Sequence, residues 1–298
     1  MKQTSPILRI AILGACLVSA TSCDKLGLGD KSPTAPSGPP AAGSTVVYAA
    51  MGASDANGVG SSVVCAPFAD CPNGMGYVPV TARTLTTQGF TVRVTNLGIA
   101  TSVIGADFAQ LGANYGRTIV GNFIEQEMPF VPQNATLVTI FAGGNEVTTI
   151  TAALGGGAGG SDPNGFIDNQ VRAFGADYNT LIAGIRARAG QPRIVILNVP
   201  NMAGLPFLAA APLAQRQAAQ RAAVGMTRTV VNALASDTVA IVDLMCDSRS
   251  YQRSIYSADG FHPNDAGYAF LASEVVKATT QTNYPRPQNS CAGMTIVP

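Results

Sequence analysis

Residues 135–144 read ATLVTIFAGG, a hydrophobic run that ends in two glycines. The run is rich in β-branched residues and is bounded by turn-forming residues, which is typical of a strand that is buried on both faces. Four further runs have the same character: STVVYAAMG (44–52), FTVRVTNLG (90–98), PRIVILNVP (192–200) and TVAIVDLM (238–245). Together they predict five strands.

Longer segments with helical periodicity lie between and after these strands. Apolar residues recur at steps of three and four within 165–190 and 212–235, and residues 263–280 predict a final helix. Pro212 suits the first turn of its helix. This alternation predicts an α/β protein with three layers, α/β/α, in which helices cover both faces of a five-stranded parallel sheet.

The charge balance argues against a nucleic-acid partner. The 298 residues carry a net charge of +1, only 12% are charged, and Lys and Arg form no basic patch of the kind that phosphate binding needs. The glycine-rich stretch 154–165 predicts a loop. It is not a phosphate cradle, because it lacks the lysine and the strand-to-helix position of a P-loop.

The N-terminus predicts export. Lys2 and Arg9 precede the apolar run 10–20, which is too short to span a bilayer and has the pattern of a signal peptide over residues 1–23. The run ends in ATSC, which resembles the lipobox of bacterial lipoproteins and makes Cys23 the candidate for lipidation. Cys16, in LGAC, and an ordinary signal-peptide cleavage near Ser22 are the alternatives.

Residues 24–44 predict a flexible linker, because Pro, Gly and Ser dominate them and they have no apolar period with which to bury a core. The folded domain is then expected over residues 45–298. This organisation predicts a cell-envelope lipoprotein, or a secreted or periplasmic protein. The only membrane contact that it implies is the lipid anchor.

Four cysteines remain beyond the leader, and an even count in an exported chain favours disulfides. Cys65 and Cys71 close a short loop and are expected to pair, which leaves Cys246 to pair with Cys291. A zinc site is poorly supported, since there is no CxxC pair and the chain has a single histidine.

Residues with complementary chemistry follow several of the predicted strands. Parallel strands bring the loops at their carboxyl ends to one edge of the sheet, where sites form. Those loops offer Ser54, Gly98 and Asn145, and the segment before the last helix offers Asp259 and His262. The stretches are MGASDANGVG (51–60), NLGIATS (96–102), FAGGNEVTT (141–149) and SADGFHPND (257–265).

These residues predict nucleophilic catalysis. A serine hydroxyl is a weak nucleophile until an imidazole accepts its proton, and a carboxylate can orient that imidazole. Ser54, His262 and Asp259 fit these roles, and the N–H groups of Ser54 and Gly98 with the amide of Asn145 fit an oxyanion hole. Each residue alone has a plainer explanation, such as a helix cap or a turn, but their convergence on one edge favours a catalytic site.

The set resembles the SGNH, or GDSL-type, hydrolase family, in which Ser, Gly, Asn and His occupy four blocks in this order. DGFHP matches the last block closely, and GGN matches the third. The resemblance covers the chain from about Thr45 to the final helix and implies a flavodoxin-like fold with the catalytic and oxyanion residues given above. Two departures occur: Asp55 follows the serine, where the family has Gly-Asp-Ser-Leu, and Glu146 replaces the usual Asp.

The resemblance implies a serine esterase or lipase that cleaves carboxylic esters through an acyl-enzyme, with a small-molecule or lipid ester as substrate. No cofactor is implied, and no cluster of Asp and His supports metal-dependent hydrolysis. A carbohydrate acetyl esterase is the first alternative, although the chain has no Trp on which a sugar could stack. The second is an anchored binding module that has lost catalysis.

Overall fold

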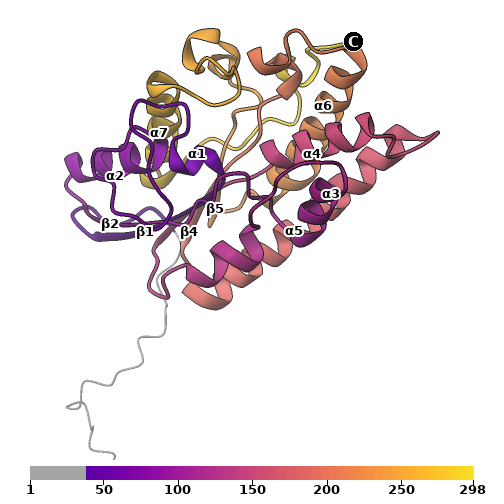
Figure 1. Ribbon diagram of the computed structural model, residues 1–298. Coiled ribbons are helices and arrows are strands. Elements are labelled where there is room, and N and C mark those ends of the chain that lie inside the picture. Colours follow the sequence, from indigo (N-terminus) through magenta and orange to yellow (C-terminus); the bar gives the residue numbers. More distant parts are fainter. Residues whose placement is uncertain (1–37) are drawn as a thin grey trace, which may run out of the picture. The chain divides into compact units, whose positions relative to one another are not determined.

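The five hydrophobic runs form one parallel sheet in the computed structural model, which describes residues 38–298 (Figure 1). The strands are β1 (Thr45–Gly52), β2 (Thr91–Asn96), β3 (Leu137–Phe141), β4 (Arg193–Leu197) and β5 (Val239–Val242). Their order across the sheet is β2-β1-β3-β4-β5, and every neighbouring pair is parallel. The predicted α/β class and flavodoxin-like sheet are confirmed.

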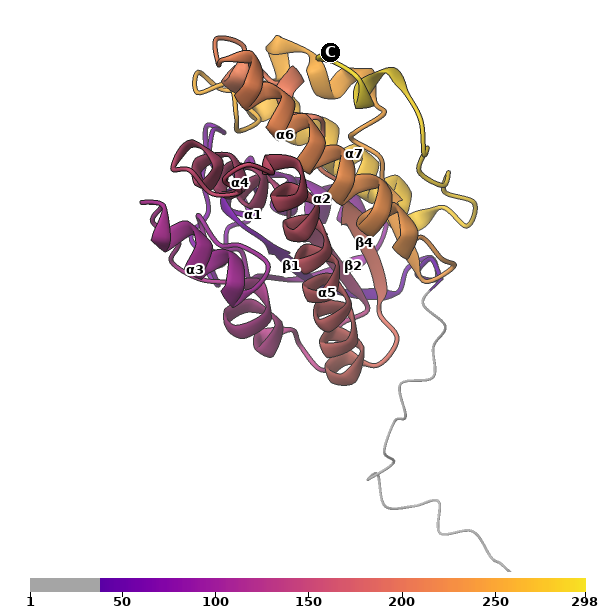
Figure 2. The same ribbon diagram turned by 90° about the vertical axis from the view of Figure 1, so that its right-hand side faces the viewer.

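Helices cover both faces of this sheet (Figures 1 and 2). One face is covered by α2 and α7, and the other by the helices from α3 to α6. The bounds are α1 (Ser54–Asn57), α2 (Tyr77–Thr87), α3 (Ala106–Asn114), α4 (Gly144–Gly155), α5 (Pro163–Ala189), α6 (Leu213–Gly225) and α7 (Asp265–Thr280).

Two hydrophobic cores follow from the alternation of side chains along each strand. Along β1, Tyr48 and Ala50 pack with Tyr77 of α2 and Leu271 of α7. Met51, on the opposite face, belongs to the second core, which the helices from α3 to α6 complete. Because successive strand residues point to opposite faces, a strand buried on both sides must be hydrophobic throughout, as these runs are.

The helices differ in detail from their predicted extents. Residues 212–235 are not one regular helix: α6 ends at Gly225, and Met226–Val231 forms a turn of π-helix before a short 3₁₀ turn. The glycine-rich loop is shorter than predicted, because α4 continues to Gly155 and α5 begins at Pro163. Asp162 caps α5 by accepting a hydrogen bond from the Gly165 N–H.

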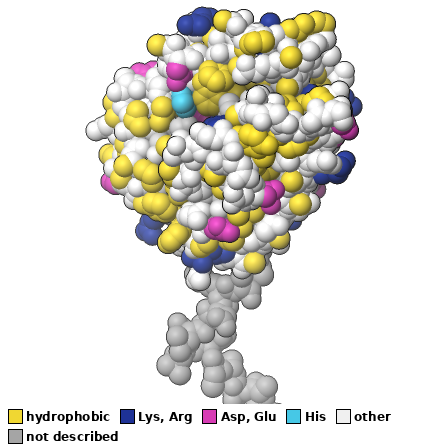
Figure 3. Space-filling view, turned by 45° about the vertical axis from the view of Figure 1, so that its right-hand side comes forward, with side chains coloured by type: hydrophobic (Ala, Val, Ile, Leu, Met, Phe, Trp, Pro, Cys, Tyr) yellow, Lys and Arg dark blue, Asp and Glu magenta, His cyan; other side chains and the backbone are white. Residues whose placement is uncertain are grey.

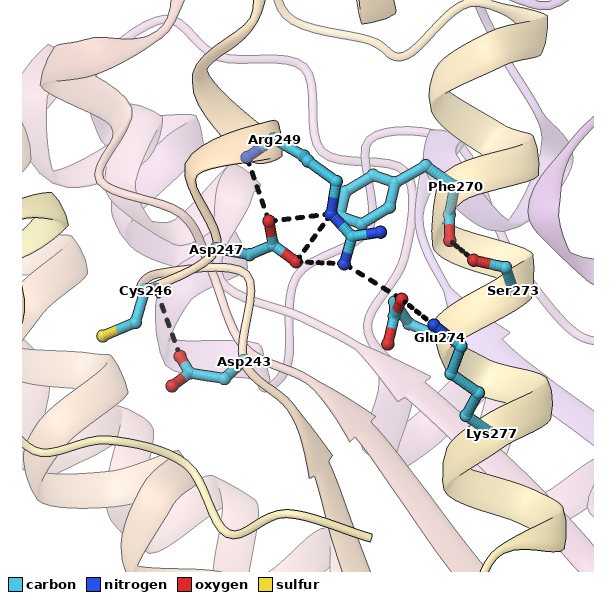
Figure 4. Close-up of polar contacts among 8 residues, drawn as sticks. All are labelled: Asp243, Cys246, Asp247, Arg249, Phe270, Ser273, Glu274 and Lys277. Atoms are coloured by element: carbon cyan, nitrogen blue, oxygen red, sulfur yellow. Dashed lines mark hydrogen bonds and ion pairs between the residues drawn. The ribbon is translucent and has the colours of Figure 1, made fainter.

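A network of hydrogen bonds and ion pairs links the segment between β5 and α7 to helix α7 (Figure 4). Arg249 donates to Asp247 and, from the same nitrogen, to Glu274 of α7 at 3.0 Å, and its guanidinium lies 4.3 Å from the centre of the Phe270 ring. Lys277 donates to the same Glu274 oxygen at 2.8 Å. The network ties the segment that carries His262 to the rigid helix that follows it.

Both expected disulfides are present. Cys65 is bonded to Cys71 in the loop after α1, and Cys246 is bonded to Cys291, which joins the loop after β5 to the C-terminal segment.

The predicted signal peptide, with Cys16 and Cys23, lies outside the described residues, as does most of the predicted linker. Between residues 38 and 298, none of the helices is long and apolar enough to cross a bilayer.

We predict that the Cys246–Cys291 bond contributes more to stability than the Cys65–Cys71 bond. Their sequence separations are 45 and 6 residues. A longer closed loop removes more entropy from the unfolded chain, which gives about 4 kcal/mol for the long loop and about 2 kcal/mol for the short one. Double Cys→Ser variants of each pair, compared by urea unfolding, measure the two contributions. Equal or reversed losses would contradict this prediction.

Candidate active site

Ser54 lies at the point where β1 gives way to α1. The strand ends at Gly52 and Ser54 is the first residue of the short helix, so its N–H has no carbonyl one turn earlier to bind. The Gly52 N–H donates to Glu127 Oε2 at 3.0 Å, which fixes the end of the strand. Ser54 therefore presents both a hydroxyl and an N–H at the carboxyl edge of the sheet.

Asp259 shapes the loop that carries His262. One oxygen of its carboxylate, Oδ1, accepts hydrogen bonds from the N–H groups of Phe261 and His262, at 2.8 and 2.9 Å, and from the hydroxyl of Ser257 at 2.8 Å. The Ser257 N–H in turn donates to the His262 carbonyl at 2.9 Å. This leaves the other carboxylate oxygen for the imidazole.

The loop after α1 packs directly on the histidine. Gly60 has a φ of +93°, and a Cβ atom at this position would come within 2.9 Å of the His262 Cβ and 2.6 Å of the Pro263 carbonyl oxygen. Only glycine allows this backbone conformation and this close an approach.

A chain of hydrogen bonds joins the three side chains. His262 Nε2 lies 2.8 Å from Ser54 Oγ, and His262 Nδ1 lies 2.6 Å from Asp259 Oδ2. With the proton on Nδ1, the ring donates to the carboxylate and its Nε2 lone pair can accept the serine proton. The structure thus brings together Ser54, Asp259 and His262, as the sequence predicts.

The carboxylate of Asp259 is held in its ionised form. Partial burial opposes ionisation, but the hydrogen bonds from the His262 ring and from the N–H groups of Phe261 and His262 outweigh it. They hold the pKa of Asp259 well below its usual range. A carboxylate that stays charged at neutral pH can stabilise an imidazolium as it forms.

Asn145 lies at the start of α4, near the turn that carries Ser54. It follows Gly144, the first residue of the helix, and its Nδ2 donates one hydrogen to the Ser102 carbonyl at 2.8 Å. An amide nitrogen carries two hydrogens, so a second remains to be donated. Asn145 and Ser102 both line a cavity beside the Ser54 turn.

The N–H of Gly98, the third oxyanion donor expected from the sequence, already has a partner in this structure. It donates to the side chain of Asn96, with Oδ1 at 3.1 Å. A Cβ atom on Gly98 would lie 2.5 Å from the Cβ of Ala56, so the glycine is needed for close packing against the α1 turn. Three residues further on, Thr101 has a φ of +68°, a left-handed conformation that costs a non-glycine residue about 1 kcal/mol. Backbone strain of this kind is often found at functional sites.

Two buried glutamates support the site, and the sequence predicts neither role. Glu127 accepts hydrogen bonds from the Gly52 N–H and from the Ser102 hydroxyl, each at 3.0 Å, and burial raises its pKa well above the usual range. Glu146 accepts from the Gly143 N–H at 2.7 Å and the Ile104 N–H at 2.5 Å, and burial raises its pKa to about 7. Glu127 occurs in a short irregular segment with no periodic or motif signal.

The cavity beside these groups is largely apolar. Its lining includes Phe123, Val199, Met202, Leu205 and Phe261. Figure 3 shows the single histidine of the chain at a hollow in the surface, next to a group of hydrophobic side chains. In the described part of the chain, no group of three or more His, Cys, Asp or Glu side chains is placed to hold a metal ion.

Comparisons with known proteins support the fold and identify the family. The chain resembles the crystal structure of the lipase Lip_vut3 from a goat rumen metagenome, with 17% identity and a TM-score of 0.56 over 80% of this chain and 99% of that one. It also resembles the extracellular lipase of Streptomyces rimosus, with 20% identity and a TM-score of 0.55 over 79% and 100% of the two chains. At these identities the likeness establishes the fold. No curated protein matches the chain.

The family itself is established by a family model. The model of the GDSL-like lipase/acylhydrolase family matches residues 50–270, which contain Ser54, Asn145, Asp259 and His262. This chain belongs to the GDSL-like lipase/acylhydrolase family of ester-hydrolysing enzymes.

Proposed function

We propose that the protein is a serine esterase that cleaves carboxylic esters with an apolar acyl group through a covalent acyl-enzyme. The observation that carries the proposal is the hydrogen-bonded chain Ser54–His262–Asp259, with distances of 2.8 and 2.6 Å. A serine at a strand-to-helix turn, an imidazole aligned with it and an ionised carboxylate behind the imidazole are the parts that acyl transfer needs.

In the first half-reaction, Ser54 Oγ attacks the ester carbonyl carbon while His262 Nε2 takes the hydroxyl proton. The tetrahedral intermediate collapses, the bond to the alcohol oxygen breaks, and His262 returns the proton to the leaving alcohol. In the second half-reaction, water attacks the acyl carbonyl carbon while His262 Nε2 takes one of its protons. The tetrahedral intermediate collapses, the bond between the acyl carbon and Ser54 Oγ breaks, and His262 returns the proton to Ser54 Oγ as the acid leaves.

The negative charge of each intermediate is stabilised by the Ser54 N–H and by the free Nδ2–H of Asn145. Each such donor contributes a few kcal/mol to the barrier reduction. The Gly98 N–H, the third donor expected from the sequence, is bound to Asn96 Oδ1 in this structure and would have to leave that partner to contribute.

The apolar lining of the cavity favours an ester with a longer acyl chain over an acetyl ester. Phe123, Met202 and Leu205 offer hydrocarbon surface, and burial of one methylene stabilises the bound ester by about 0.8 kcal/mol.

The N-terminal pattern and the two disulfides support export, with residues 1–23 as a signal peptide, Cys23 as a lipid-anchored terminus and 24–44 as a tether to the domain.

We expect the protein to hydrolyse p-nitrophenyl esters. Its kcat/KM is expected to rise by up to about fourfold for each methylene added to the acyl group, starting from acetate, until the acyl chain fills the cavity.

The Ser54→Ala variant is expected to lose at least about 10³-fold in kcat, because the nucleophile is removed. Initial rates across an acetate-to-decanoate series measure both effects. Ser236→Ala, in the turn before β5 and at the opposite end of the sheet, is a control that keeps Ser54.

Two outcomes would change the assignment. An optimum at acetate, with faster turnover of acetylated sugars, would indicate the carbohydrate esterase. No difference between the wild type and Ser54→Ala, with both folded by circular dichroism, would contradict the proposed mechanism and favour a binding module.

We expect Asp259→Asn to lower kcat by about 10³–10⁴-fold, because an amide cannot hold the imidazole in the tautomer that accepts the serine proton. The comparison variant is Asp265→Asn, whose carboxylate binds the backbone and hydroxyl of Ser62 and does not contact the imidazole. Steady-state kinetics of both variants test this. A similar loss in the two variants would assign Asp259 to loop structure rather than to catalysis.

A further inference from the structure

The orientation of the Asn145 side chain is set by two contacts on opposite sides of its amide. Nδ2 donates to the Ser102 carbonyl at 2.8 Å, and Oδ1 accepts from Arg117 Nη2 at 3.4 Å. A carboxamide can rotate by 180° and exchange its oxygen with its nitrogen. In the rotated state, Arg117 would face an NH₂ group and the Ser102 carbonyl would face an oxygen, so both contacts would become repulsive.

Arg117 is anchored where it can hold this position. Its backbone N–H donates to the Gly112 carbonyl at 2.9 Å, at the end of α3. The guanidinium reaches across to α4, where Nη1 donates to the Asn145 carbonyl at 3.0 Å and to the hydroxyls of Thr148 and Thr149. One arginine thus binds both the backbone and the side chain of Asn145.

Within residues 38–298, Arg117 has no carboxylate among its hydrogen-bond partners. The side chain is half-buried, and its hydrogen-bond partners in the described part of the chain are all neutral. Burial lowers its pKa, and the nearby charge of Glu146 opposes this effect. Because removing a cation from water is unfavourable unless a carboxylate pairs with it, this arrangement carries a cost in stability.

We propose that Arg117 is a positioning residue for ester hydrolysis. It fixes the Asn145 amide so that the second Nδ2–H faces the oxyanion, and it places positive charge behind that donor. This inference rests on the proposed function, because it assigns to Asn145 the role of an oxyanion donor. The guanidinium makes no contact with the reacting atoms and acts through Asn145.

Kinetics of Arg117→Met, Arg117→Lys and Asn145→Ala test the proposal, with Arg83→Met as the matched control. Arg83 is also half-buried and donates to backbone carbonyls, those of Pro72 and Gly74. We expect Asn145→Ala to lower kcat by about 10²–10³-fold, as removal of an oxyanion donor does. Arg117→Met is expected to lower kcat about tenfold with KM within about twofold, and Arg117→Lys to recover part of the loss because it keeps the charge.

A double-mutant cycle separates positioning from a general loss of structure. In the Asn145→Ala background, Arg117→Met is expected to change kcat by less than about twofold, because the residue through which it acts is gone. A full tenfold loss in that background, or an equal loss in Arg83→Met, would overturn the proposal.

A second readout does not depend on turnover. The side-chain NH₂ signal of Asn145, assigned in ¹⁵N spectra by its absence in Asn145→Ala, is expected to exchange with solvent about tenfold faster in Arg117→Met than in the wild type or in Arg83→Met. Unchanged exchange would show that Arg117 does not hold the amide. If the wild type cleaves no ester, the proposed function fails, and this measurement still decides whether Arg117 positions Asn145.

Discussion

The hydrogen bond between Ser54 and His262 joins residues that are 208 positions apart, so it depends on the fold that brings them together. Neither side chain could hold the other in an unfolded chain. The parallel sheet brings the end of β1 to the edge at which the segment before α7 also arrives. A hydrogen bond of 2.8 Å needs both partners to be fixed to within a fraction of an ångström, so rigid elements must carry them.

Each partner is fixed by hydrogen bonds from its surroundings. Glu127 binds the N–H at the end of β1 and, through the Ser102 hydroxyl, the loop to which Asn145 is bonded. Arg249 ties the segment before His262 to α7, and Asp259 organises its own loop with one oxygen while it orients the imidazole with the other. Of these groups, Glu127 is fully buried, and hydrogen bonds to both of its carboxyl oxygens offset the cost of removing it from water.

The sequence predicts the sheet and the three residues of the hydrogen-bonded chain well, because these depend on local patterns. Continuous apolar runs give the strands, and the DGFHP stretch carries Asp259 and His262 on one tight loop. The sequence does not predict the partner of the Gly98 N–H, which is the Asn96 side chain. Arg117 and Glu127 lie in irregular segments, where function depends on contacts with residues distant in sequence. The sequence does not predict helix α2 either, because Thr and Val, which favour strands, fill it.

The central claim is that Ser54 is the activated nucleophile of this chain. An alkyl fluorophosphonate, which reacts with a serine only when an imidazole activates it, tests the claim without any assumption about the substrate. Intact-mass measurement after labelling is expected to show one adduct per chain, with peptide mapping placing it on Ser54 and with no adduct on His262→Ala. A wild type that stays unlabelled while folded, or an adduct on another serine, would contradict the account.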